Sequence, residues 1–214
     1  MVEIFSAGEG EYTEKKSKFL GVVASVKSEE EAVAFLEAKK KQYHDARHNC
    51  SAWRICGASG EVTSRFSDDG EPSGTAGKPM LEVLEGAGVV NAICVVTRYF
   101  GGVLLGTGGL VRAYTESAKR ALAAAQTMER RQGQRLSIAT DYHGYGKIEY
   151  LLRAAEVPIV DTRYESEVIL SCVVAPDQKG RLEAQIVEAT SGLARLEYGE
   201  ETGFAVLNGE VVFL

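Results

Sequence analysis

The stretch that decides the fold is residues 92–126, "AICVVTRYFGGVLLGTGGLVRAYTESAKRALAAAQ". Residues 92–100 are mostly apolar and predict a buried β-strand. Five glycines follow between Gly101 and Gly109, and an alanine-rich segment comes directly after them. The apolar side chains of that segment recur at helical spacing and predict a helix with one buried face: Leu110, Tyr114, Ala118, Ala121, Leu122 and Ala125. We expect this strand, turn and helix to form the centre of the first domain.

A strand that enters a helix through glycines presents unpaired N–H groups and the positive end of a helix dipole, which attract anions. A phosphate could therefore bind the amides of Gly106 to Gly109. Thr107 and either Arg98 or Arg112 would be its side-chain partners. The structural alternative is that the glycines only permit a tight turn and close packing of helix on sheet. Both interpretations stay open.

A second glycine-rich stretch, "SDDGEPSGTAGKPM", occupies residues 67–80. It is not a Walker phosphate loop, because the position five before Gly77 is Pro72. The residue after Lys78 is Pro79, which offers neither a hydroxyl to magnesium nor an N–H to phosphate. The stretch therefore predicts a rigid polar turn.

Two kinds of chemistry could be built from the polar residues around this turn. Asp68, Asp69 and Glu71 carry the oxygen ligands that magnesium prefers, although such carboxylates more often close turn hydrogen bonds. His48 and Cys50 are a conceivable base and nucleophile, but residues two apart on a strand need not meet. Since no third group orients them, we assign no catalytic residue, metal or cofactor, and we favour a binding protein over an enzyme.

The chain as a whole predicts two α+β domains, residues 1–133 and 134–214. Beyond the first domain the order is strand, helix, strand, strand, helix, strand between residues 135 and 198, which is the ferredoxin-like split motif. Asn208-Gly209 then predicts the tight turn of a hairpin.

Charge is divided unevenly between these two parts. Residues 1–133 hold 17 Lys/Arg and 17 Asp/Glu, whereas residues 134–214 hold 7 and 13, so the net charge of −6 lies entirely in the second part. This argues against a general nucleic-acid clamp but leaves room for a local basic patch. No apolar run approaches the ~18–20 residues of a membrane span, and we expect a cytoplasmic protein without membrane contact.

Four segments in order resemble the YigZ/Impact family. They are "KKSKF" (15–19), "HDARHNCSAW" (44–53), "FSDDGEPSGTAGKPML" (66–81) and "VVTRYFGGVLLGTGGLVRAY" (95–114). The resemblance spans the whole chain and implies an N-terminal β/α two-layer sandwich similar to elongation factor G domain IV. The C-terminal domain would be ferredoxin-like. Eukaryotic relatives regulate translation by interfering with activation of a kinase that phosphorylates an initiation factor.

Carried over to this chain, the resemblance implies one recognition surface on the N-terminal domain. Its side chains would be Lys18, His48, Asp68, Asp69, Glu71, Lys78, Arg98, Tyr99, Thr107 and Arg112. Its shape would come from Gly101, Gly102, Gly106, Gly108 and Gly109.

Three functions fit this expected surface. The leading interpretation is a translation-associated regulator that binds RNA, the ribosome or a translation factor, and that would need clustered basic residues. The alternative is a protein or enzyme for a nucleotide or phosphorylated metabolite, with the turn of residues 101–109 as anion cradle and a concave pocket. A protein–protein regulator would instead show an exposed apolar patch. The sequence leaves the oligomeric state open.

Overall fold

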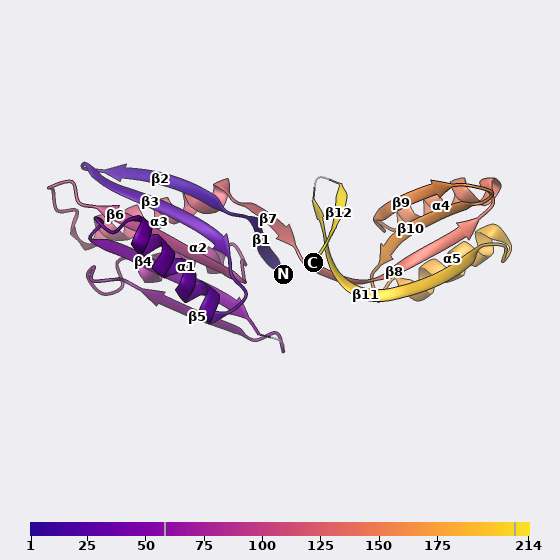
Figure 1. Ribbon diagram of the computed structural model, residues 1–214, viewed down its shortest axis with the longest axis horizontal. Helices are drawn as coiled ribbons and strands as arrows, with labels where there is room; N and C mark the ends of the chain where they lie inside the picture. Colours follow the sequence, from indigo (N-terminus) through magenta and orange to yellow (C-terminus); the bar gives the residue numbers. More distant parts are fainter. Residues whose placement is uncertain (58, 208) are drawn as a thin grey trace. The chain divides into compact units, whose positions relative to one another are not determined.

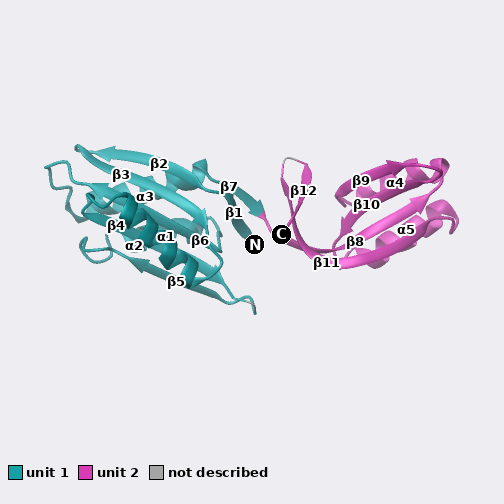
Figure 2. Ribbon diagram, in the orientation of Figure 1, with its two compact units in different colours: residues 1–128 teal, residues 129–214 magenta. Residues whose placement is uncertain are grey.

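The computed structural model describes residues 1–57, 59–207 and 209–214. They form two compact units, Met1–Met128 and Glu129–Leu214, each with its own sheet and core (Figure 2). The boundary predicted at residue 133 falls inside a strand of the second unit, β8 (Arg131–Thr140). The predicted α+β class is confirmed.

The first unit is built on a five-stranded antiparallel sheet with the order β2-β3-β6-β4-β5 (Figure 1). Its strands are β2 (Gly8–Glu14), β3 (Ser17–Ser25), β4 (His48–Cys56), β5 (Val62–Ser67) and β6 (Ala92–Tyr99). Two further strands, β1 (Val2–Ser6) and β7 (Gln126–Glu129), pair with each other. The central strand β6 is buried at every residue except its last, as its apolar sequence predicts.

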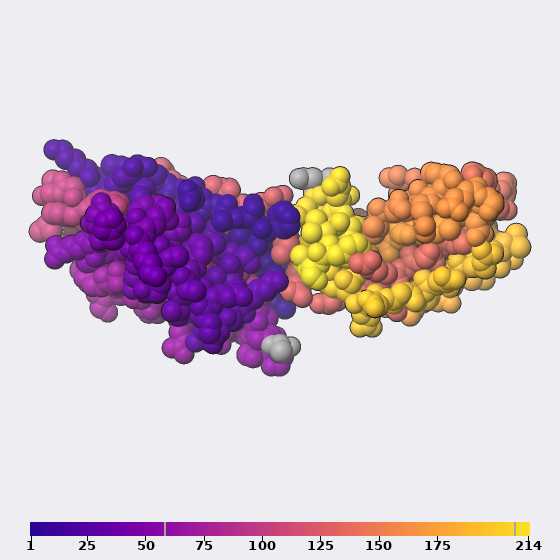
Figure 3. Space-filling model, viewed as in Figure 1, coloured from indigo at the N-terminus to yellow at the C-terminus, as the bar shows by residue number. Residues whose placement is uncertain are grey.

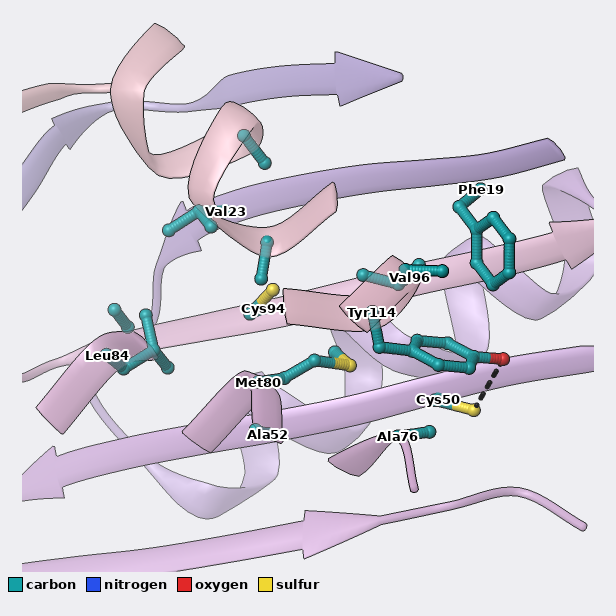
Figure 4. Close-up of a cluster of buried hydrophobic side chains, with 14 of the residues drawn as sticks. Phe19, Val23, Cys50, Ala52, Ala76, Met80, Leu84, Cys94, Val96 and Tyr114 are labelled. Carbon is teal, nitrogen blue, oxygen red and sulfur yellow. Dashed lines mark hydrogen bonds between the residues drawn. The ribbon is translucent and has the colours of Figure 1, made fainter. Parts of the chain in front are cut away.

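Helices cover both faces of this sheet. Cys94 and Val96 of β6 belong to the core under α2 (Gly77–Gly86) and α3 (Gly106–Ala124), which Figure 4 shows in close-up. The alternate residues Ile93 and Val95 pack with Ala32 of α1 (Glu29–Gln42) on the opposite face. The first unit therefore has α2 and α3 on one face of the sheet and α1 on the opposite face.

Helix α1 is the helix of this unit that is most exposed. It begins after Ser28, whose Oγ accepts a hydrogen bond from the Glu31 backbone N–H, and Ala32 is its one fully buried residue. The visible face of the first unit in Figure 3 is dominated by the indigo and violet of α1 and the N-terminal strands. The segments that form the candidate site belong instead to β4, β6, the β5–α2 loop and the start of α3.

The second unit is ferredoxin-like. Its elements are β8, α4 (Tyr142–Ala154), β9 (Ile159–Tyr164), β10 (Val168–Val174), α5 (Lys179–Thr190), β11 (Arg195–Leu207) and β12 (Glu210–Phe213). The sheet order β12-β11-β8-β10-β9 contains the four strands of the predicted βαββαβ motif, with β12 added at the edge.

The last part of the chain differs from its prediction in one respect. Arg195–Leu207 is one long strand, with a register shift between Tyr198 and Glu201, where a strand and a separate hairpin were expected. An irregularity at this point bends the strand without ending it. The hairpin turn predicted at Asn208-Gly209 includes Asn208, which lies outside the described residues. Within the described ranges, no helix combines the length and the apolar character needed to cross a membrane.

Candidate functional site

The two glycine-rich stretches of the first unit meet at one cleft of about 400 Å³. The β5–α2 loop supplies one wall, and the end of β6 with the start of α3 supplies the other. Its lining residues are Arg47, His48, Glu71, Pro72, Arg98, Phe100, Leu104, Leu105, Gly106, Thr107 and Leu110. A concave site therefore exists where the two motifs converge.

A buried ion pair contributes to the wall of the cleft. Arg98 Nη1 lies 2.5 Å from Glu71 Oε1, and their side chains are only 7% and 3% exposed. The Tyr114 hydroxyl donates to the same Oε1 at 2.9 Å. Burial raises the pKa of Tyr114, so this hydroxyl remains a donor at all physiological pH values.

Much of the hydrogen-bonding capacity of this pair is unused. A guanidinium has five N–H donors, and within the described part of the chain the one hydrogen bond of the Arg98 guanidinium is to Glu71. Its Nε is buried, and no described residue supplies an acceptor for it. Both protein hydrogen bonds to the Glu71 carboxylate arrive at Oε1. The guanidinium lies 5.5 Å from the Phe19 ring centroid and 5.6 Å from that of Phe100, where cation–π attraction contributes.

Asp68 holds the β5–α2 loop together through hydrogen bonds from the backbone. Its Oδ1 accepts from the backbone N–H groups of Ala76 and Gly77 at 3.0 and 2.8 Å, and its Oδ2 accepts from Gly74 at 2.8 Å. The carboxylate thus satisfies the free amides at the start of α2, where negative charge is also favoured by the helix dipole. A Cβ at Gly77 would lie 2.8 Å from the Ser67 backbone, so the tight loop requires glycine there. Asp68 therefore has a structural role in the loop.

Asp69 and His48 connect the loop to β4. The Asp69 carboxylate accepts from the Asn49 backbone N–H at 2.7 Å, and the Asp69 carbonyl lies 2.7 Å from His48 Nδ1. Because a carbonyl only accepts, Nδ1 must carry the proton, which leaves His48 Nε2 without this bond. Since His48 lines the cleft, its second nitrogen is available to a ligand.

Cys50, two residues after His48 on β4, is a buried packing residue. Its thiol donates to the Asp68 carbonyl at 3.0 Å and lies 3.4 Å from the Tyr114 hydroxyl (Figure 4). Burial raises the pKa of Cys50, which keeps the thiol neutral. His48 and Cys50 contact different partners, so they do not form the nucleophile–base pair that their spacing allowed. No cluster of three or more potential metal ligands occurs among the described residues.

The glycine-rich stretch of residues 101–109 is divided between a turn and a helix. Gly101 lies against the Lys16 backbone, where a Cβ would approach a carbonyl carbon to 2.1 Å, and Gly102 has a φ of 83°. Helix α3 already begins at Gly106, with a φ of 72°, so Gly108 and Gly109 are helical. The first turn of α3 contains no acidic residue, and its cap residue Leu105 makes no side-chain capping bond. Among the described residues, no side chain therefore caps the first amides of α3.

The predicted surface residues occupy several places. His48, Glu71, Arg98, Gly106 and Thr107 line the cleft. Lys18 instead lies 3.0 Å from Glu11, and the Tyr99 hydroxyl donates to Asp45. Exposed Lys78 and Arg112 lie on α2 and α3 outside the lining of the cleft. The structure thus brings together five of the predicted residues and gives Asp68 and Asp69 supporting roles.

Sequence reasoning missed most of the apolar part of the cleft. Five of its eleven lining residues have apolar side chains, namely Pro72, Phe100, Leu104, Leu105 and Leu110, and Arg47 adds a cation. The available signal was the run Val103–Leu105, three apolar residues inside a glycine-rich turn. Leu104 is 82% exposed, and its neighbours Phe100 and Val103 are exposed as well, so this segment presents a group of apolar side chains of the kind that marks a binding surface.

Comparisons with known proteins agree with this division into two parts. The family model of the Impact N-terminal domain matches residues 15–122, and a domain of unknown function, DUF1949, matches residues 138–193. The IMPACT family member YvyE of Bacillus subtilis is 38% identical over 92% of this chain and 89% of its own.

Two solved structures extend the comparison. A crystal structure of a hypothetical protein, 35% identical, covers 93% of this chain and 97% of its own with a TM-score of 0.59. The two-domain translational regulator Yih1, 28% identical, covers 56% of this chain and 48% of its own with a TM-score of 0.38. The matched domains and the identity to YvyE over most of both chains lead to one conclusion: this chain belongs to the IMPACT family.

Proposed function

We propose that this chain is a translation-associated binding protein and that it recognises its partner through the cleft of the N-terminal unit. Membership of the IMPACT family, whose eukaryotic members regulate translation, supports the connection with translation. The observation that carries the proposal for the site is the buried Arg98–Glu71 pair in the wall of the cleft, whose hydrogen-bonding capacity is only partly used by the described residues.

The energetics of this ion pair favour recognition over a purely structural role. Removing two charges from water is expensive, and apolar residues of similar volume often stabilise a core equally well. A buried guanidinium with unpaired donors adds a further desolvation cost. A partner that accepts hydrogen bonds from Arg98 would offset that cost, which gives the pair a reason to lie beside a cleft.

Binding also fits the chemistry of the surrounding side chains better than catalysis does. The carboxylates of Asp68 and Asp69 accept hydrogen bonds from backbone amides, and the Cys50 thiol is held neutral by burial. His48 is anchored through Nδ1. The described residues of the cleft therefore present donors, one carboxylate and an apolar wall, and none of them is an activated nucleophile.

The distribution of charge favours a compact contact with the partner. Lys18 is neutralised by Glu11, and Arg98 is buried against Glu71. A long basic track along an RNA backbone is therefore a poor description of this surface. A second candidate, a free small ligand, is supported by the cleft volume of about 400 Å³, which lies in the range of small-molecule sites.

Co-sedimentation with ribosomes tests the proposal through the cleft wall. Leu104→Asp introduces a charge at an 82% exposed position that lines the cleft, so folding should be unaffected. Val33→Asp makes the same kind of change at a 49% exposed position of α1, on the other face of the sheet. We expect the wild type and Val33→Asp to co-sediment and Leu104→Asp to bind at least tenfold more weakly. Absence of binding at low salt, or equal binding by all three proteins, would overturn the proposal.

A further inference from the structure

One end of the cleft is formed by the N-terminus of α3. Helix α3 extends over 19 residues, and its first-turn amides have no partner within the helix. In α2 the equivalent amides are satisfied by Asp68, but among the described residues no side chain satisfies those of α3. Gly106 and Thr107 of this open turn line the cleft. An open helix N-terminus attracts phosphate through its N–H groups and its dipole.

The Arg98 side chain is a second indication of an anionic ligand, independent of the helix. It is only 7% exposed, it lines the cleft, and its Nε has no acceptor in the described part of the protein. Arg47 also lines the cleft, and Glu71 is its one acidic residue. Two arginines against one carboxylate leave the cleft with an excess of positive charge, so an anion is favoured.

Gly108 supports a close approach to the amides of this turn. Glycine in a helix costs about 1 kcal/mol relative to alanine. The other glycines of the turn have a local reason, but a Cβ at Gly108 would contact nothing within 4 Å, and its φ is not positive. Neither packing nor backbone conformation therefore requires glycine at this position. Its absent side chain leaves the end of the helix accessible to a ligand.

The apolar wall indicates what the anion is attached to. Phe100 and Leu104 line the cleft and are 49% and 82% exposed, so a ligand would remove both from water. An exposed aromatic ring beside a guanidinium is a typical stacking site for a nucleobase. Glu71 Oε2 has no hydrogen-bond partner among the described residues and could accept from a base amino group.

We propose that the cleft binds a single nucleotide, with its phosphate on the first-turn amides of α3 and on Arg98 and its base against Phe100 and Leu104. The inference rests on the proposed function, because both concern the same cleft. A free mononucleotide and an unpaired nucleotide of RNA share this chemistry.

Calorimetric titration of the full chain with AMP, GMP, CMP and UMP tests the site, with adenosine and inorganic phosphate as partial ligands. We expect at least one mononucleotide to bind at least tenfold more tightly than adenosine or phosphate. The variant Gly108→Glu places a carboxylate at the N-terminus of α3, where it stabilises the helix but repels a phosphate. Gly108→Gln is its neutral match. The expected result is at least a tenfold loss of nucleotide affinity in Gly108→Glu relative to Gly108→Gln, with both melting temperatures at or above that of the wild type.

A 5′-phosphorylated tetranucleotide distinguishes the two sources of the ligand. Tighter binding of the tetranucleotide than of any mononucleotide identifies RNA, and the reverse order identifies a free nucleotide. Absence of binding by all of these probes at millimolar concentration, or equal nucleotide affinities of the wild type and Gly108→Glu, would overturn the inference. Ribosome binding that depends on Leu104 would then leave the proposed function intact, so the two failures are distinguishable.

Discussion

At the scale of single residues, the sequence identified several residues of the cleft but could not predict which side chains pair with one another. Charged and hydroxyl residues of the motifs were predicted to form one surface, and His48, Glu71 and Arg98 do lie at one cleft. The turn interpretation of Asp68 also agrees with its three backbone hydrogen bonds. The pairing of Lys18 with Glu11 was beyond local reasoning, because it depends on the register between β2 and β3.

The Arg98–Glu71 pair makes a strong prediction about stability. Glu71→Ala leaves a buried guanidinium without its carboxylate and should lower the free energy of unfolding by about 3–5 kcal/mol. Urea denaturation measures this directly. The double variant Glu71→Met/Arg98→Met removes both charges and should recover most of the loss. A cost below about 1 kcal/mol for Glu71→Ala would show that the charge of Arg98 is solvated.

The cysteines give a prediction that depends on pH. Burial raises the pKa of both Cys94 and Cys172 to about 12, and it also raises that of Cys50. At pH 8 these thiols should resist iodoacetamide in the native protein, while the partly exposed Cys56 reacts, as mass spectrometry of the labelled peptides would reveal.

The same thiols contribute to stability in a defined pH window. Since their pKa is higher in the folded state, the contribution is complete below the ordinary thiol value of about 9 and decreases as pH rises toward 12. Denaturation at a series of pH values should therefore show falling stability above about pH 9. Rapid alkylation of Cys94 at pH 8 without unfolding would contradict the burial of this thiol.

At the scale of elements, the apolar periods of the sequence predicted β6 and α3 well. The start of α3 was less predictable: the glycines of residues 106–109 were expected to form a turn, yet they form the first turn of the helix. Glycine has low helix propensity, so local preference argued against this start, and tertiary packing of Leu110 and Tyr114 decides it. The aromatic run that ends at Phe100 suggested base stacking from the sequence, but Leu104 and Leu105 were missed because polar motif residues were considered first.

Two glycines at the starts of neighbouring helices should respond oppositely to alanine. Gly77→Ala forces a Cβ to within 2.8 Å of the Ser67 backbone and should destabilise the protein by about 1–3 kcal/mol. Gly108→Ala places its Cβ in open space and should stabilise it by about 0.5–1 kcal/mol. Thermal unfolding of the two variants measures both signs, and destabilisation by Gly108→Ala would contradict the open geometry of α3.

At the scale of the whole molecule, the sequence predicted the charge of each part and the fold of the second unit. It could not predict which charged side chains lie at the cleft. The sequence indicated a neutral first part and an acidic second part, and the βαββαβ order of the second unit was confirmed. Ion pairs such as Lys18–Glu11 further reduce the free positive charge of the first unit. Recognition is therefore expected to depend on one compact cleft, and binding should respond weakly to salt.

The salt dependence of ribosome binding, measured for the wild type, Leu104→Asp and Val33→Asp, tests this central claim most directly. For about one bound phosphate, the logarithm of the binding constant should fall with the logarithm of salt concentration with a slope of roughly −0.7. Only Leu104→Asp should lose binding at low salt. A slope of about −4, as expected for six phosphates on a basic track, or undiminished binding by Leu104→Asp, would contradict recognition through the cleft.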